Sequence, residues 1–160
     1  MKEMDKDGLI LCELQGKAFE LSVDLCDEGS QIFVRRFMNS KTANEFDTLA
    51  ILQTNLRERD VLERIDEEYG KSDYGTIKYS QNEMFWIGYI YRYWSYTYGK
   101  SSRQLYRIVK PKELRDLFLP YHTLSPAQAI ERILESKGLP INEADILARQ
   151  YAIYRRIRMA

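Results

Sequence analysis

The hydrophobic residues of this chain recur mostly at helical spacing, and the clearest case is a tyrosine-rich segment. Positions 81 to 98 read QNEMFWIGYIYRYWSYTY. Small or polar residues interrupt the aromatic run at intervals of 4, 3 and 4, namely Gly88, Arg92, Ser95 and Gly99. This spacing forms one stripe of an α-helix, whereas a period of two would place Arg92 among the large apolar residues.

Capping signals mark both ends of this segment. Ser80 and Glu83 match a capping box, in which the hydroxyl and the carboxylate each accept a hydrogen bond from an otherwise unpaired amide. Gly99 can adopt the left-handed conformation that ends a helix. The sequence therefore predicts a central aromatic helix from about 81 to 98, against the β-propensity of its tyrosines.

Two short helices are expected next along the chain. Ser101 or Ser102 can cap a helix that runs through Val109, and Pro111 suits the first position of another helix through Phe118. The segment TLSPAQAIERILESKG then gives the strongest helical signal in the chain. Its cap, first-turn proline, capping-box partner and terminating glycine are Ser125, Pro126, Gln128 and Gly138.

A final helix is expected after Pro140 and Asn142. Its apolar stripe comprises Ile146, Leu147, Tyr151, Tyr154 and Ile157.

The N-terminal part gives a weaker pattern. CELQGKAFELSVDL and SQIFVRRFMNS each fit either a helical or an alternating arrangement, which leaves helix or strand open for residues 9–38, and we predict helices there. Residues 45–69 fit one long helix or two short ones, and residues 70–79 form the expected loop because they contain two glycines.

Together these elements predict an all-α fold, a multi-helix bundle with the aromatic helix at its centre. A length of 160 residues fits one domain, 1–160, with N-terminal helices over about 16–70 and the aromatic and C-terminal helices over about 80–160. The longest apolar run, at about 84 to 98, is too short to cross roughly 30 Å of hydrocarbon. An acidic start without a signal-peptide pattern and two cysteines favour the cytoplasm.

Charge is balanced overall but unevenly distributed. Residues 1–28 carry eight acids and three lysines, a net charge of −5, whereas residues 100–115 carry six bases and one acid, a net charge of +5. Such asymmetry suits an anionic ligand or a charged protein partner, and it suits equally well neutralisation within the fold.

The residues offer little for catalysis, for a metal or for a cofactor. Gly99, Lys100 and Ser101 resemble the end of a phosphate-binding loop, but Trp94 stands where that motif needs its first glycine. One histidine and two cysteines cannot furnish four zinc ligands. His122 is the single imidazole, and we expect it in a loop, hydrogen-bonded to nearby backbone. No catalytic, cofactor-binding or metal-binding residue is therefore assigned.

A family resemblance adds a function. Residues 85–133, FWIGYIYRYWSYTYGKSSRQLYRIVKPKELRDLFLPYHTLSPAQAIERI, resemble the core of an uncharacterised bacterial helical protein family, as do GKAFELS and IFVRRFMNS. The succession of elements is similar to that of an antitoxin-like component in operons that encode a predicted ADP-ribosyltransferase-like toxin. The resemblance implies a toxin-antitoxin module with a toxin partner, and it supplies no catalytic residues.

We therefore expect a non-enzymatic protein-binding module, with a homo-oligomer also compatible with the sequence. Tyrosine and tryptophan are enriched at interfaces, and the candidate partner contacts are Arg92, Trp94, Tyr96, Tyr98 and His122. The alternative is a DNA-binding regulator that uses the bases of residues 100–115 and of the last helix. Its candidate contacts are Arg103, Arg107, Lys110, Arg155, Arg156 and Arg158.

Overall fold

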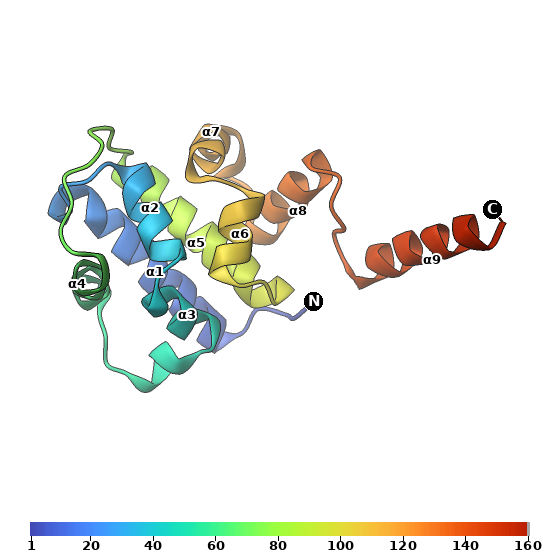
Figure 1. Cartoon of the computed structure of the whole chain (residues 1–160), viewed down its shortest axis with the longest axis horizontal. Helices are drawn as coiled ribbons and strands as arrows, with labels where there is room; N and C mark the ends of the chain where they lie inside the picture. The colour runs from blue at the N-terminus through green and yellow to red at the C-terminus, as the bar shows by residue number, and fades with distance from the viewer. Residues whose placement is uncertain (160) are drawn as a thin grey trace.

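The computed structural model describes residues 1–159, which form nine α-helices and one short 3-10 helix without any β-strand (Figure 1). The all-α prediction is confirmed. The helices are α1 Lys6–Leu25, α2 Ser30–Met38, α3 Lys41–Asp47, α4 Glu58–Tyr69, α5 Gln81–Tyr98, α6 Ser102–Ile108, α7 Pro111–Tyr121, α8 Pro126–Ser136 and α9 Glu143–Met159, with the 3-10 helix η1 at Ala50–Gln53.

The aromatic segment is the central helix, and its ends lie where the capping signals predict them. The Ser80 hydroxyl accepts a hydrogen bond from the Glu83 amide, and a Glu83 carboxylate oxygen accepts one from the Ser80 amide at 2.9 Å. Gly99 ends α5 in the left-handed conformation, with φ +63°. Nine of the 18 residues of α5 are buried because α1, α6, α7 and α8 pack around it.

The contact between α1 and α5 depends on a glycine. A Cβ atom at Gly88 would lie 2.9 Å from the backbone oxygen of Gln15 and 2.8 Å from the Phe19 ring, so no larger residue fits without displacing backbone. The Gln15 side-chain amide in turn donates to the Gly88 carbonyl at 3.0 Å. This close approach fixes α1 across the middle of the aromatic helix.

Helix α1 begins about ten residues earlier than predicted. Asp5 caps it by accepting a hydrogen bond from the Gly8 amide at 2.9 Å. The charged start of the chain therefore forms the first turns of a packed helix, whose Leu11 and Cys12 are fully buried. The two ambiguous N-terminal segments are helical, as predicted.

Residues 45–69 form more than the one or two helices expected. They contain the end of α3, then η1, then α4, and Leu49 breaks the helical path with φ +66°. Residues 70–79 form the predicted loop.

A single hydrophobic core joins helices α1 to α8. We call these eight helices the body. Four phenylalanines at its centre pack with ring centroids 5.0 to 6.3 Å apart, mostly edge to face; they are Phe19, Phe33, Phe37 and Phe46. Edge-to-face pairs add to the stability that area burial gives. This phenylalanine cluster is thus shared by α1, α2 and α3.

The C-terminal helices begin as the sequence predicts but do not all pack. Ser125 and Gln128 form the expected capping box of α8, while α7 runs past Phe118 to Tyr121 and includes Pro120. Helix α9 projects from the body, and none of its residues up to Met159 is buried (Figure 1). The apolar stripe predicted for this helix is therefore present but faces solvent.

Candidate functional site

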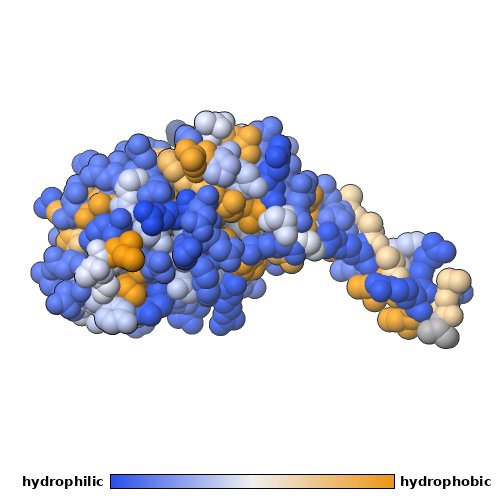
Figure 2. Space-filling view, turned by 90° about the horizontal axis from the view of Figure 1, so that it is seen from above, coloured by the Kyte–Doolittle hydropathy of each residue, from blue (hydrophilic) through white to orange (hydrophobic). Residues whose placement is uncertain are grey.

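The projecting helix α9, which we call the arm, carries an uncovered hydrophobic stripe. Leu147, Tyr154 and Ile157 are 64%, 56% and 73% exposed, and their spacing of seven and three residues places them on one face. Ile146 and Ile153 extend this face, and Tyr151 borders it. Figure 2 shows hydrophobic side chains along the arm, which extends from the body as a separate projection.

Positive charge flanks the stripe on both sides. By helical spacing, Arg149 and Arg156 lie beside Ile146 and Ile153, and Arg155 lies on the other flank beside Tyr151. Arg158, near the end of the helix, falls between Leu147 and Tyr151 in this projection. Residues 146–159 contain four arginines and no acidic residue, a formal charge of +4. The arm is therefore both amphipathic and basic.

The base of the arm is held by polar contacts. Asn142 caps α9 by accepting a hydrogen bond from the Asp145 amide at 2.8 Å. The Tyr98 hydroxyl donates to the Ile141 carbonyl at 2.8 Å. The amino group of Met1 pairs with Glu143 at 2.5 Å, and this hydrogen bond lowers the pKa of the Glu143 carboxyl. In the second turn, Arg149 donates to the Gly138 carbonyl at 2.5 Å and pairs with Asp145 at 3.2 Å. These contacts hold the first two turns of α9 at the end of α8.

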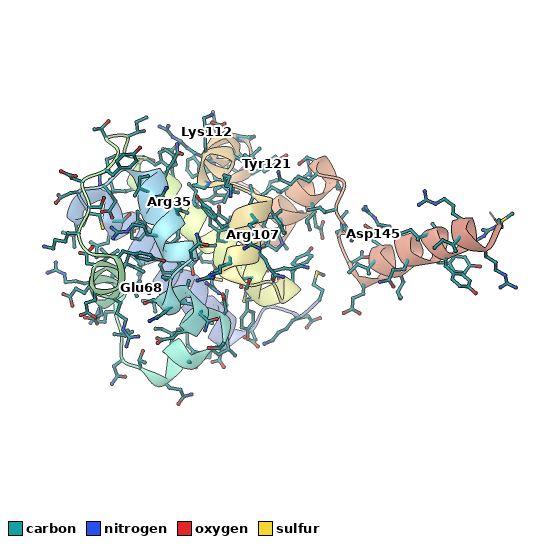
Figure 3. All side chains as sticks on the ribbon, viewed as in Figure 1. Arg35, Glu68, Arg107, Lys112, Tyr121 and Asp145 are labelled. Carbon is teal, nitrogen blue, oxygen red and sulfur yellow. The ribbon has the colours of Figure 1, made fainter. Side chains whose placement is uncertain are left out.

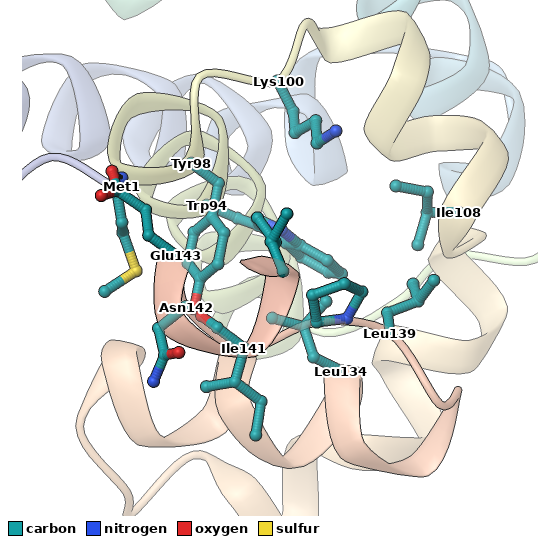
Figure 4. Close-up of a pocket in the computed structure, with 12 residues that line it drawn as sticks. Met1, Trp94, Tyr98, Lys100, Ile108, Leu134, Leu139, Ile141, Asn142 and Glu143 are labelled. Atoms are coloured by element: carbon teal, nitrogen blue, oxygen red, sulfur yellow. Dashed lines mark hydrogen bonds and ion pairs between the residues drawn. The ribbon is translucent and has the colours of Figure 1, made fainter. Parts of the chain in front are cut away.

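A small apolar hollow of about 210 Å³ lies at this base (Figure 4). Its walls come from α5, α6, α8 and the segment before the arm, and they include Trp94, Tyr98, Ile108, Leu134, Leu139 and Ile141. Lys100, Asn142 and Glu143 supply the polar rim. Because drug-sized ligands occupy roughly 300 Å³ or more, the hollow suits a single apolar side chain.

Arg92, predicted to contact a partner, is instead a buried junction of the fold. Its side chain is 2% exposed and pairs with Asp47 at 2.6 Å. The remaining donors reach three further side chains at 2.7 to 3.1 Å, which belong to Gln15, Ser95 and Ser102. Burial lowers the pKa of Arg92, and Asp47 partly offsets this. Arg92 therefore joins α1, α3, α5 and α6 and offers no surface to a partner.

The aromatic candidates differ in their surroundings. Trp94 is 1% exposed and belongs to the core, which corrects its assignment as a direct contact. Tyr96 is half-buried, and its hydroxyl donates to Asp5 at 2.6 Å while the Lys2 ammonium lies 4.0 Å from the ring centroid. Tyr98 is half-buried in the wall of the hollow. Of these three residues, Tyr98 lies nearest to the arm, because its hydroxyl contacts the Ile141 carbonyl at the base of the arm.

His122 lies at the end of α7, where it is exposed. Its Nδ1 atom lies 2.7 Å from the Phe118 carbonyl oxygen, and its ring stacks on Phe118 with centroids 4.5 Å apart. The predicted hydrogen bond to nearby backbone is confirmed. Since a carbonyl only accepts, Nδ1 carries the proton. A contact between His122 and a partner stays a prediction.

The six basic candidates for DNA binding are all exposed but occupy two separate surfaces. Arg103 and Arg107 lie on α6, with Lys110 just after it, whereas Arg155, Arg156 and Arg158 lie on the arm (Figure 1). The structure therefore does not form one DNA-binding surface from both groups.

Burial suppresses the ionisation of both cysteine thiols. Burial raises the pKa of Cys12 and of Cys26 to about 12 each, and a thiolate is the reactive form of cysteine. Cys12 is fully buried, whereas Cys26 is partly accessible.

We expect neither thiol to react with an alkylating reagent at neutral pH while the protein is folded, with Cys12 the slower of the two. Since both folded-state pKa values exceed the ordinary 9.0, ionisation favours the unfolded chain. The free energy of unfolding should therefore be insensitive to these thiols below about pH 9 and fall as the pH rises toward 12. Mass spectrometry of alkylated samples checks the first point, with urea-unfolded protein as control; equal labelling of both samples would contradict it.

Comparisons with protein-family models, with curated proteins and with solved structures find no match for this chain. Within residues 1–159 no three histidine, cysteine or acidic side chains lie close enough together to hold a metal ion. No helix in that range combines the length and the hydrophobicity that crossing a bilayer requires.

The sequence pattern located the stripe of the arm, and one feature of the sequence pointed to its being uncovered. The absence of acids after Asp145, while arginines continue to Arg158, was the available signal, because it makes the helix too basic to pack easily on a basic neighbour. The walls of the hollow come from residues spread between positions 94 and 141, so no local sequence pattern predicted it.

Proposed function

We propose that the protein is a protein-binding module that captures its partner with the arm. The observation that carries the proposal is a 17-residue helix with a continuous apolar stripe and no buried residue. Most helical stability in proteins comes from packing of an amphipathic face, and an isolated helix of this length is marginal in water. The arm therefore gains stability when its stripe lies in an apolar groove, a common mode of peptide recognition.

The positive charge of the arm indicates which kind of groove on the partner it fits. Arginines on both flanks of the stripe favour a partner whose groove has acidic rims, because complementary charge speeds association and excludes competing partners. Two copies of the stripe-bearing part of the arm, residues 146–159, would bring together +4 and +4, which disfavours pairing of one arm with another. The best partner is thus an acidic protein other than a second arm.

The family resemblance suggests which protein this is. In the proposal the partner is the toxin of a shared operon, and the module acts without catalysis by occupying the toxin's surface or active cleft. The two unpaired cysteines suit a complex that forms in the cytoplasm. The hollow at the base of the arm can take one apolar side chain of the partner next to the docked helix.

The test compares two double variants of the arm in co-purification with the product of the neighbouring gene. Leu147→Asp with Tyr154→Asp places charges in the stripe. Ala148→Asp with Ala152→Asp makes the same change in charge on the opposite face of the same exposed helix. We expect the stripe variant to weaken the complex roughly 100-fold or more, and the control to weaken it only a few-fold through charge.

Both variants should unfold at the same urea concentration as the natural chain, because the arm lies outside the core. Equal loss of binding in the two variants would show that charge, not the stripe, is recognised. Separate elution of the two natural proteins at micromolar concentration would remove the toxin as the partner.

A further inference from the structure

Three segments far apart in the sequence form a second surface, on α2, on the loop after α4 and on α6. The Arg103 guanidinium of α6 donates to the Asn39 carbonyl after α2 at 2.9 Å. The loop is joined to the start of α2, where the Gly29 amide donates to the Tyr74 carbonyl at 2.9 Å. An open hollow of about 480 Å³ lies there, lined in part by Arg35, Tyr69, Lys71 and Tyr74.

The cations of this surface have no acidic partner. Figure 3 shows Arg35 and Arg107 on the adjacent helices α2 and α6. Five exposed bases belong to the surface, and within residues 1–159 none of them forms an ion pair. They are Arg35, Lys71, Arg103, Arg107 and Lys110. Other bases of the body, such as Arg64 and Arg115, are paired.

Tyrosines are interleaved with these bases. Tyr74 is 70% exposed and Tyr69 is 42% exposed, so both rings are accessible from solvent. The Arg36 guanidinium lies over the Tyr69 ring at 5.0 Å, and the Lys110 ammonium lies over the Tyr106 ring at 4.0 Å. We call the five bases together with Tyr69, Tyr74 and Tyr106 the basic face.

Electrostatic effects on the tyrosines support this proximity. Burial raises the pKa of Tyr106, and the positive charge of Arg35 partly offsets that rise. Burial likewise raises the pKa of Tyr69, which Glu68 raises further and Arg103 lowers. Two acids lie near the face. Glu68 at its edge accepts a hydrogen bond from the Lys41 amide at 2.9 Å, and Asp73 is exposed in the loop beside Tyr74.

We propose that the basic face binds single-stranded nucleic acid. Arginine and lysine side chains contact backbone phosphates, and exposed aromatic rings stack on unpaired bases, which is how single strands are held without sequence preference. In this arrangement Arg35, Arg103 and Arg107 contact phosphates, and Tyr74 stacks on a base. Exposed rings set among unpaired cations favour a single strand over an acidic protein, because phosphates and unpaired bases alternate along the strand. The inference uses no residue of the arm and is independent of the proposed function.

Fluorescence anisotropy of the full chain with labelled oligonucleotides of about 12 nucleotides tests this inference. The probes are single-stranded DNA, single-stranded RNA and duplex DNA. We expect both single strands to bind more tightly than the duplex. Three phosphate contacts predict roughly a 20-fold loss of affinity between about 50 mM and 200 mM salt. The two single-stranded probes separate DNA from RNA as the preferred ligand.

Variants place the site. Arg35→Glu with Arg103→Glu should abolish binding, whereas Arg155→Glu with Arg156→Glu on the arm makes the same change in charge and should alter affinity less than about threefold. Tyr74→Ala should weaken binding about 10-fold without altering the salt dependence. All five residues are exposed, so the variants should keep the urea midpoint of the natural chain.

Several results would overturn the inference. These are no binding at low salt, equal binding of the duplex, equally strong competition by poly-glutamate, or loss of binding in the arm variant with retention in the face variant. Because the arm variants of the co-purification test leave the basic face intact, failure of either proposal is distinguishable from failure of the other.

Discussion

Replacing Arg92 with alanine should destabilise the body by about 3–5 kcal/mol, because breaking a buried ion pair leaves its partner groups unpaired. The guanidinium is the common donor to Asp47, Gln15, Ser95 and Ser102. Its removal leaves the Gln15 side-chain oxygen Oε1 without this donor inside the α1–α5 contact, where the residue is fully buried. Water cannot easily replace a donor that links four helices.

Urea unfolding followed by circular dichroism measures this effect. The matched control is Arg64→Ala, which removes an ion pair of the same 2.6 Å length to Glu45, with side chains 35% and 37% exposed. Half-exposed pairs contribute about 0–1 kcal/mol, so the control should change the free energy of unfolding little. Similar losses for both variants would show that Arg92 is not the junction that its contacts indicate.

Trp94→Ala should also cost about 3–5 kcal/mol, the usual range for removing a large buried aromatic side chain. The indole is 1% exposed, and its loss would enlarge the hollow at the base of the arm because Trp94 forms part of its wall. A cavity there would be incompletely filled, since Leu134 and Ile108 are held by α8 and α6.

Trp86→Ala is the internal control on the same helix. Trp86 is half-buried and contacts the Phe118 ring edge to face at 5.9 Å, so its removal should cost about half as much. Urea titration gives both values, and the remaining tryptophan reports on its own surroundings by fluorescence. A smaller loss for Trp94 than for Trp86 would contradict its place in the core. Because Trp94 is buried, weaker partner binding by the Trp94→Ala variant would be attributed to loss of stability and not to a lost contact with the partner.

The ends of several helices followed from the sequence because caps are local. Ser80 with Glu83, Ser101 with Gln104, and Ser125 with Gln128 each form a capping box within four consecutive residues. The start of α1 was not predicted, because it depends on tertiary packing as well as on a local cap. Asp5 is a good cap, but the residues after it, KDG, are charged or small, and the packing of Gly8 under Tyr96 is what keeps this turn in place.

Candidate site residues were harder to place. The bases Arg103, Arg107 and Lys110 were recognised on one helix, and the structure adds Arg35 from α2 and Tyr74 from the loop. Arg92 and Trp94 stood out by composition, yet their burial makes them part of the framework. Spacing along the chain ranks residues by type and face but does not show what covers that face.

By itself the sequence determined that the chain is helical, where α5, α6 and α8 begin and end, and that the last helix has an apolar stripe with arginines beside it. These properties depend on residues within about four positions of one another. Only the tertiary structure decided which of these faces is covered, because burial depends on contacts such as Gln15 to Arg92, which join residues 77 positions apart. The same long-range packing encloses Arg92, leaves the arm uncovered and gathers the tyrosines and arginines of the basic face.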